Sequence, residues 1–174
     1  MSEAIRSQLE GLRVALPDDA AALTHVINAA FKKESFFKKG DRIDEAQVVE
    51  KLKTGNFYAI EREHVIVGCV YVEVAREGED HLIAKGEGAG YIGMLAVEPS
   101  RQGSGLGKKL MAFAEAELQR RGCTRIQLRI VNLRTELLEF YGRQGYRETG
   151  TTPYPFPNKL TMPVHFIDME KQVG

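Results

Sequence analysis

The sequence predicts a mixed α/β fold in which helices flank one central sheet. Short apolar stretches typical of strands alternate with amphipathic stretches typical of helices, and no internal repeat or low-complexity linker interrupts them. The length of 174 residues and the hydrophobic content of 43% suit one core and leave no room for a second. We therefore expect a single domain over residues 1–174.

The first half of the chain is expected to run strand, helix, helix, strand, strand, over residues 12–16, about 19–33, 44–54, 57–61 and 65–74. Asp18 follows the first strand and can cap the first helix. One face of that helix has apolar residues at helical spacing: Leu23, Val26, Ile27 and Ala30. Residues 31–42 read as a loop or broken helix, and Gly55 stops the second helix. The last two strands form a hairpin with Glu63 and His64 at its turn.

The second half is expected to add a strand ending at Val97, a helix over about 105–121, a strand over 126–132, a helix over 135–144, and strands over 146–149 and 164–169. The longer helix has one apolar stripe: Leu106, Leu110, Met111, Ala114 and Leu118. Gly122 lies just past its end. Thr135 is expected to cap the shorter helix, which Gly145 ends.

The charge and composition exclude several classes of partner. Lys+Arg and Asp+Glu both number 24, so no broad basic field favours nucleic acid or an anionic membrane. The first fourteen residues have no apolar targeting segment, and no later run approaches membrane-spanning length. We expect a soluble cytoplasmic protein. Cys69 and Cys123 are expected to be reduced core thiols, and no histidine or cysteine cluster has the spacing of a metal site.

Residues 94–109 predict a site for a phosphorylated ligand. A short apolar strand and a turn lead into three alternating glycines, Gly103, Gly105 and Gly107, directly ahead of a helix. Glycines allow the backbone to bend tightly and approach a ligand, and the free N–H groups that open a helix point at negative charge.

Two well-known glycine-rich loops do not fit. A Walker loop would need glycine at Gln102 and a hydroxyl residue at Lys109. A Rossmann fingerprint counted from Gly103 and Gly105 would need glycine at Lys108. The chain is therefore not expected to bind ATP or NAD through this loop.

Residues 102–107, Gln-Gly-Ser-Gly-Leu-Gly, match the Gln/Arg-x-x-Gly-x-Gly/Ala signature of the GNAT N-acetyltransferases. The match continues through the strand at 126–132 and through residues 136–146, where Tyr141, Gly145 and Tyr146 fit the family's Tyr-x-x-x-Gly-Phe/Tyr pattern. Residues 90–150 carry the resemblance well, and the N-terminal third fits by element order alone. The chain resembles a GNAT superfamily N-acetyltransferase.

The resemblance implies a mostly antiparallel sheet with strands four and five splayed apart, and acetyl-CoA as the acetyl-donor cosubstrate. It implies that the backbone of Leu95, Ala96 and Val97 contacts the pantetheine arm. The pyrophosphate would lie against Gln102, Gly103, Ser104, Gly105, Leu106, Gly107 and Lys108. Tyr141 would be catalytic, its phenol donating a hydrogen bond to the departing thiolate.

Two positions depart from the family pattern. Asn132 lies two residues further from Tyr141 than the asparagine of many members, and Arg134 holds the nearer position. Asn132 therefore either hydrogen-bonds the pantetheine arm or is a turn residue that opens the next helix. Tyr91 stands where several members carry a glutamate base. Glu73 and Glu98 are the alternative bases to consider, and each has the ordinary interpretation of a solvated charge.

The expected reaction is transfer of acetyl from acetyl-CoA to a primary amine of a small molecule, by direct attack in a ternary complex. Acetylation of a protein N-terminus or lysine, and a non-catalytic acyl-CoA sensor, are the alternatives, and a homodimer is left open. Five aromatic residues can form an apolar wall for the acceptor or merely cap a hydrophobic turn: Phe31, Phe36, Phe37, Tyr154 and Phe156. Lysines interleave with the first three, which suits an amine bearing an apolar or acidic group.

Overall fold

The computed structural model describes residues 9–174, so most of the segment used above to argue against a targeting sequence lies outside it. Seven strands form one sheet in the order β1-β2-β3-β4-β5-β7-β6. The strands are β1 (Leu12–Val14), β2 (Asn56–Arg62), β3 (Val65–Val74), β4 (Ala89–Val97), β5 (Arg125–Val131), β6 (Arg147–Pro153) and β7 (His165–Gln172). All neighbours pair antiparallel except β4 and β5, which pair parallel. The expected mixed, mostly antiparallel sheet is confirmed.

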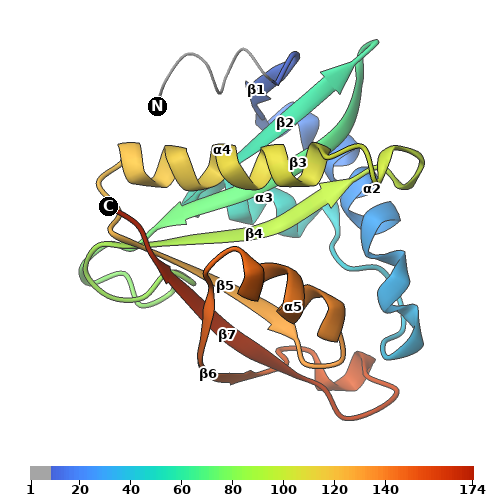
Figure 1. The fold of residues 1–174 in the computed structure, drawn as a ribbon. Coiled ribbons are helices and arrows are strands. Elements are labelled where there is room, and N and C mark those ends of the chain that lie inside the picture. The colour runs from blue at the N-terminus through green and yellow to red at the C-terminus, as the bar shows by residue number, and fades with distance from the viewer. Residues whose placement is uncertain (1–8) are drawn as a thin grey trace.

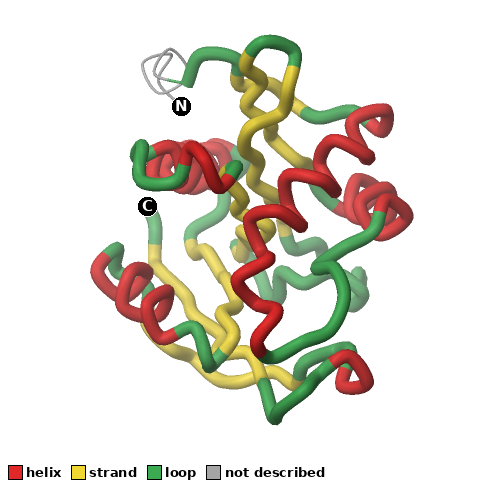
Figure 2. Tube along the Cα trace, turned by 90° about the vertical axis from the view of Figure 1, so that its right-hand side faces the viewer, coloured by secondary structure: helices red, strands yellow, loops and turns green. Residues whose placement is uncertain are grey.

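Helices cover both faces of the sheet (Figures 1 and 2). The α-helices are α2 (Ala20–Phe31), α3 (Glu45–Thr54), α4 (Leu106–Arg120) and α5 (Thr135–Arg143). Apolar residues of α4 and α5 share one hydrophobic cluster with the strands on one face, whereas α2 and α3 share a second cluster on the other face. A third, smaller cluster joins Phe37 to the ends of β5 and β7.

The expected elements are present, and two of the expected helix caps are wrong. Residues 17–19 form a 3₁₀ turn, and Asp19 rather than Asp18 precedes α2. Its carboxylate accepts from the Leu16 amide at 2.8 Å and binds Arg13. The cap position of α5 is Arg134 rather than Thr135, and its side chain makes no capping bond.

The second expected helix, the hairpin turn and the broken helix form where they are expected. Asp44 caps α3 by accepting from the Gln47 amide at 2.8 Å, and Gln47 returns a bond to the Asp44 amide, so that the pair forms a capping box. Glu63 and His64, at the turn between β2 and β3, both have positive φ, as a tight hairpin turn requires. The broken helix after α2 is a 3₁₀ turn, η2 (Lys32–Phe36).

Cys69 and Cys123 are both buried and unpaired. No helix within residues 9–174 has the length and apolar character needed to cross a membrane. In the same residues, no group of three or more His, Cys, Asp or Glu side chains is arranged to hold a metal ion.

Candidate active site

The sheet opens between β4 and β5 to form the site. These strands pair only at Ala89–Tyr91 with Arg125–Gln127, and beyond this point they diverge. Three steps along β4, from Gly93 to Ala96, face two along β3, so β4 carries a bulge there. Met94 lies in the bulge with φ 49°, a backbone conformation rare for a residue with a side chain. The bulge turns β4 away from β5 and leaves one edge of β4 without a strand partner.

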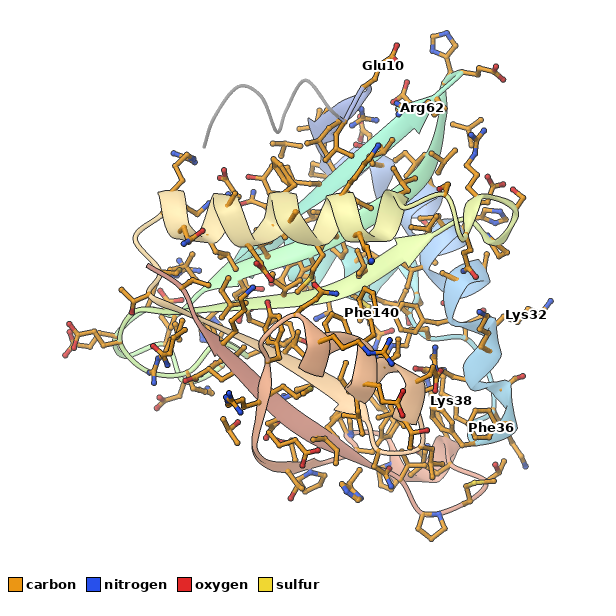
Figure 3. All side chains as sticks on the ribbon, in the orientation of Figure 1. Glu10, Lys32, Phe36, Lys38, Arg62 and Phe140 are labelled. Atoms are coloured by element: carbon orange, nitrogen blue, oxygen red, sulfur yellow. The ribbon has the colours of Figure 1, made fainter. Side chains whose placement is uncertain are left out.

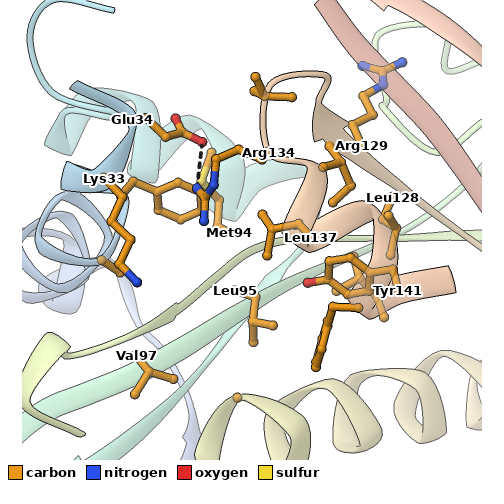
Figure 4. A pocket seen from close by; sticks show the side chains of 18 of the residues that line it. Lys33, Glu34, Met94, Leu95, Val97, Leu128, Arg129, Arg134, Leu137 and Tyr141 are labelled. Carbon is orange, nitrogen blue, oxygen red and sulfur yellow. Dashed lines mark ion pairs between the residues drawn. The ribbon is translucent and has the colours of Figure 1, made fainter. Parts of the chain in front are cut away.

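A cavity of about 610 Å³ occupies the space between the splayed strands (Figure 4). Its walls come from β4, β5, α5, the end of α2 and the residues that lead into α4. This volume falls within the range of ligand pockets in proteins, roughly 300–1,000 Å³. The sheet has thus been opened to make a binding site at its centre.

One end of this cavity is a cradle for an anion. Gly103 and Gly105 have φ values of 84° and 82°, which glycine adopts without strain, and a Cβ added at either would meet nothing within 4 Å. No side chain caps the start of α4, and no acidic residue lies in its first turn. The first amides of the helix are therefore free for a negatively charged ligand. A pyrophosphate fits these residues.

The loop ahead of α4 is tied down on both sides. The Gln102 side-chain amide donates to the carbonyl of Val97 at 3.2 Å, which fixes the loop to the end of β4. The Ser104 hydroxyl donates to the carbonyl of Arg101 at 2.6 Å. Gly103 lies between these two anchored residues and Gly105 follows the second directly, so the loop is held in place at the start of α4.

The structure brings most of the expected site residues to this cavity. Those that line it are Leu95, Val97, Gln102, Gly103, Gly105, Gly107, Lys108 and Tyr141. Ala96 alternates to the opposite face of β4 and packs with α2 and α3, Leu106 packs against the core, and Ser104 is exposed. Ala96, Ser104 and Leu106 can still contact a ligand through their backbone, because their main chain belongs to the same strand and loop as the residues that line the cavity.

Asn132 does not line the cavity. Its side-chain oxygen accepts from the His165 amide at 3.0 Å, and its own amide donates to the His165 carbonyl at 3.0 Å. These bonds extend the pairing of β5 with β7 by one residue. The geometry therefore favours the turn interpretation of Asn132 over contact with a pantetheine arm.

Tyr141 projects from α5 into the cavity. Its ring packs edge-on against Phe140 and Tyr146, with centroids 5.1 and 5.8 Å away. The hydroxyl points between Leu95 and Leu137 toward the middle of the cavity (Figure 4). It has no hydrogen-bond partner among the described residues. Burial raises the pKa of Tyr141 to about 12, so the phenol is a protonated donor at neutral pH.

The two glutamates considered as bases are both engaged elsewhere. Glu73 is buried, and its carboxylate accepts from the amides of Ile83 and Ala84 at 2.6 and 2.8 Å and from the Tyr71 hydroxyl at 2.9 Å. These bonds anchor the loop between β3 and β4. Glu98 lies past the end of β4 and pairs with Arg101 at 3.2 Å. Neither lines the cavity.

A carboxylate that was not considered does reach the cavity. Glu34 of η2 is 3% exposed and pairs with two arginines: Arg42 at 3.4 Å and Arg134 at 3.7 Å. Figure 4 shows the pair with Arg134. Arg134 also pairs with Glu136. The arginine that replaces the family's asparagine therefore joins η2 to the start of α5. Glu34 lies a hundred positions before Arg134, and Glu136 lies two positions after it. The motifs near Arg134 gave no indication of the ion pair with Glu34.

The five residues of the expected aromatic wall do not lie together. Phe31 lines the cavity, Phe37 is buried in the third core cluster, and Phe36 is 52% exposed. Figure 3 shows Lys32 pointing away from the molecule. Lys38 is buried and donates to the carbonyls of Gly40 and Asp41, so it serves the turn rather than an acceptor.

A second cavity of about 510 Å³ adjoins the first and shares five of its wall residues: Arg42, Tyr91, Met94, Arg129 and Phe166. It lies against α3 and the loop after β6, and Tyr154 and Phe156 line it. Sequence reasoning missed Arg42 and Arg129. The polar residues at alternate positions of the central strand β5, Gln127 and Arg129, were the available signal.

The comparisons with known proteins agree with this geometry. Residues 21–146 match the model of the acetyltransferase (GNAT) family. The chain belongs to this family.

Among curated proteins, mycothiol acetyltransferase of Cellulomonas flavigena is 30% identical over 109 residues, which cover 63% of this chain and 31% of that protein. The match therefore spans about a third of the length of that relative.

Among solved structures, ribosomal-protein-alanine N-acetyltransferase from Brucella melitensis superposes with a TM-score of 0.71 at 20% identity, covering 93% of this chain and 99% of that one. The paia N-acetyltransferase of Thermoplasma acidophilum, solved in complex with coenzyme A, gives 0.70 at 15% identity, with coverages of 93% and 98%. At these identities the likeness concerns the fold.

Proposed function

We propose that this chain acts as one acetyltransferase domain that transfers acetyl from acetyl-CoA to the primary amine of a small molecule. The observation that carries the proposal is that the glycine cradle and the Tyr141 hydroxyl open into the same cavity between β4 and β5. An anion site alone would suit many ligands. An anion site together with a buried phenol donor suits the two ends of a thioester of coenzyme A.

The cradle and the open edge of β4 would hold the donor. The amides around Gly103–Lys108 would bind the pyrophosphate, with Lys108 adding a positive charge. Leu95 and Val97 face the cavity, and their backbone lies on the side of β4 that β5 leaves unpaired. An extended arm can bond to that edge as an added strand would.

Acetyl-CoA supplies an activated acetyl group as a thioester when bound. A free thiol such as cysteine has a pKa of about 8.5, well below the value of about 12 for Tyr141. Full proton transfer from the phenol is therefore uphill. The role of Tyr141 is to donate a hydrogen bond where negative charge develops on sulfur, in a site that holds the phenol protonated.

Direct attack by the amine is favoured over an acyl-cysteine step. Cys69 and Cys123 are buried, and neither lines either cavity. Burial raises the pKa of the Cys69 thiol to about 12, which suppresses the nucleophilic thiolate. The second cavity, which meets the first at Tyr91 and Met94, can hold the amine beside the donor.

The test is a thiol-release screen in which acetyl-CoA is supplied with simple amines, amino acids and short peptides. Transfer to small amines, confirmed by mass spectrometry of the acetylated product, supports the proposal. A preference for peptides alone would favour the protein-acetylation alternative. Tight acetyl-CoA binding without transfer to any acceptor in the panel would favour the sensor alternative.

A further inference from the structure

The second cavity collects positive charge from three separate elements. Arg42 precedes α3, Lys51 lies on α3, and Arg129 lies on β5. The two carboxylates that line the same cavity are already committed: Asp44 caps α3, and Glu50 pairs with Lys53 at 2.6 Å. The walls therefore present an excess of positive charge toward any occupant.

Lys51 is the cation without a carboxylate partner. Arg42 pairs with Glu34 at 3.4 Å, and Arg129 pairs with Asp168 at 3.1 Å. The described residues place no carboxylate oxygen within 4 Å of the Lys51 ammonium, which instead lies 4.9 Å from the centre of the Tyr71 ring. The charge of Glu73 on β3 acts on Lys51 from a distance, and its carboxylate is held by the three hydrogen bonds described above.

The electrostatic environment of Lys51 disfavours its charge in the absence of a ligand. Burial lowers the pKa of Lys51, and Arg42 and Arg129 add to this effect while Glu73 opposes it. An anion placed among these three side chains would reverse the effect, because it would attract all three charges at once. One unneutralised positive charge matches a carboxylate better than a dianionic phosphate.

The remaining walls of the second cavity are aromatic: Tyr91, Tyr154, Phe156 and Phe166. They suit an apolar body between two polar ends. A polyamine would place further positive charge beside Lys51 and the two arginines and would be repelled.

We propose that the second cavity holds the acceptor, and that the acceptor is a primary amine that also carries a carboxylate, bound by Lys51 with Arg42 and Arg129. The amine end would lie toward Tyr91 and Met94, where the second cavity meets the first. This inference rests on the proposed acetyl transfer and names its substrate class: small amino acids and related aminocarboxylates.

The kinetic test uses acceptor pairs that differ only in the anionic group, phenylalanine with phenylalaninamide and 4-aminobutyrate with 4-aminobutanamide, together with spermidine. We expect at least one carboxylate to be acetylated with a higher kcat/KM than its amide, and spermidine to be the poorest acceptor. Lys51→Met should raise KM for that carboxylate about tenfold to a hundredfold and leave its amide within about twofold. Lys51→Arg should retain most of the preference.

Lys32→Met is the control, because Lys32 is exposed, points away from the molecule (Figure 3), lines neither cavity and makes no ion pair within the described residues. This variant should leave kcat/KM unchanged for both the carboxylate and the amide of each acceptor pair. Three results would each overturn the inference while leaving acetyl transfer intact. The first is an equal loss of kcat/KM on carboxylate and amide in Lys51→Met. The others are the absence of a carboxylate preference in both acceptor pairs, and spermidine as the best acceptor.

A binding experiment separates this inference from the proposed function. Calorimetry with coenzyme A present measures binding of N-acetylphenylalanine and its amide, which requires no turnover. Loss of carboxylate binding in Lys51→Met, with retention in Lys32→Met, supports the anion site even if no amine is acetylated. Binding that is unchanged in Lys51→Met, or undetectable in the unmutated chain, contradicts it.

Discussion

At the scale of single residues, the candidate site depends on the Tyr141 hydroxyl, which has no hydrogen-bond partner among the described residues. Tyr141 is 7% exposed and is held by aromatic contacts with Phe140 and Tyr146. Tyr146 is also buried, but its hydroxyl donates to Glu115 at 2.9 Å. The two neighbouring tyrosines thus differ in the surroundings of their hydroxyls: that of Tyr146 has a carboxylate partner, and that of Tyr141 faces a cavity.

Replacing Tyr141 with phenylalanine should separate chemistry from binding. The ring and its packing remain, so acetyl-CoA affinity and stability should change little. Turnover should fall roughly tenfold to a thousandfold, because a hydrogen bond to the developing thiolate is lost. Steady-state kinetics on an accepted amine, with calorimetry for acetyl-CoA, measures both.

Tyr146→Phe is the matched control for this change. It removes a hydroxyl of the same chemistry that lies outside the cavity, so stability should fall modestly and turnover should stay within about threefold. Equal turnover in the unmutated chain and in Tyr141→Phe, with chemistry limiting the rate, would remove Tyr141 from the mechanism.

At the scale of elements, α4 performs different tasks at its two ends. Its start forms the cradle at Gly105, and its last turn is locked to β2. Glu117 accepts from Arg120, Arg121 and the Tyr58 hydroxyl at 2.7, 2.9 and 3.0 Å. The C-terminal lock fixes the helix on the sheet, and the helix in turn holds the cradle beside the open edge of β4.

Gly105→Val should weaken acetyl-CoA binding at least tenfold. Its Cβ would enter the space left for a phosphate, and the φ of 82° strains any side chain. Gly122→Val is the control, because Gly122 follows the other end of α4 with φ 89° and equally open space. Both variants carry similar strain, so comparable melting temperatures with acetyl-CoA affinity lost in Gly105→Val alone support the cradle. Equal affinity in the two variants contradicts it.

Glu117→Gln should destabilise the protein and reduce its sensitivity to acid. Hydrogen bonds from Arg120, and then from Arg121 and Tyr58, lower the pKa of Glu117 from 4.5 to about 2 against the opposing effect of burial. Because the folded-state value is depressed, the stabilisation is fully present above the unfolded pKa and is lost as the pH falls from about 4.5 toward about 2.

The expected loss at neutral pH is about 2–3 kcal/mol in the free energy of unfolding, measured by denaturant titration. The difference in free energy of unfolding between Glu117→Gln and the unmutated chain should become smaller in titrations at lower pH. Glu139→Gln, which breaks an exposed pair with Arg143, should cost less than about 0.5 kcal/mol at any pH. A gap for Glu117→Gln that stays constant down to pH 3 would contradict the assigned pKa.

At the scale of the whole molecule, the sheet consists of two parts joined by a short parallel seam. β1–β4 form one part and β5–β7 the other, and between them only Ala89–Tyr91 pair with Arg125–Gln127. The first cavity has walls from both parts. A ligand there contacts both sides of the split and should stabilise the molecule as a unit.

Acetyl-CoA at a hundredfold excess over its dissociation constant should stabilise the fold by about 2.7 kcal/mol, which raises the melting temperature by roughly 5–10 °C for a chain of this size. NAD and ATP at the same concentration should give no comparable shift, since the loop lacks their motifs. Differential scanning fluorimetry measures all three. A shift as large with NAD or ATP would show that the cradle is not selective.

Several local features of this protein could be predicted from short segments of its sequence. The glycines at 103, 105 and 107 and the hairpin turn at Glu63 and His64 each depend on a few adjacent residues, so the sequence indicates them directly. The two wrong helix caps differ in origin. Asp19 takes the place of Asp18 because residues 17–19 form a local 3₁₀ turn, whereas Arg134, at the cap position of α5, pairs with Glu34, which lies a hundred positions earlier.

The sequence by itself determined the order of strands and helices and the loop at the start of α4, because these follow from periodicity and glycine spacing within short segments. It also indicated the family, through the resemblance of its motifs at 102–107 and 141–146 to those of the GNAT N-acetyltransferases. Only the tertiary structure decided which side chains share a cavity. Whether a charge is free, as for Lys51, or engaged, as for Glu73, depends on neighbours supplied by distant elements. Sequence spacing does not encode those contacts, because packing of the whole sheet and its helices brings them together.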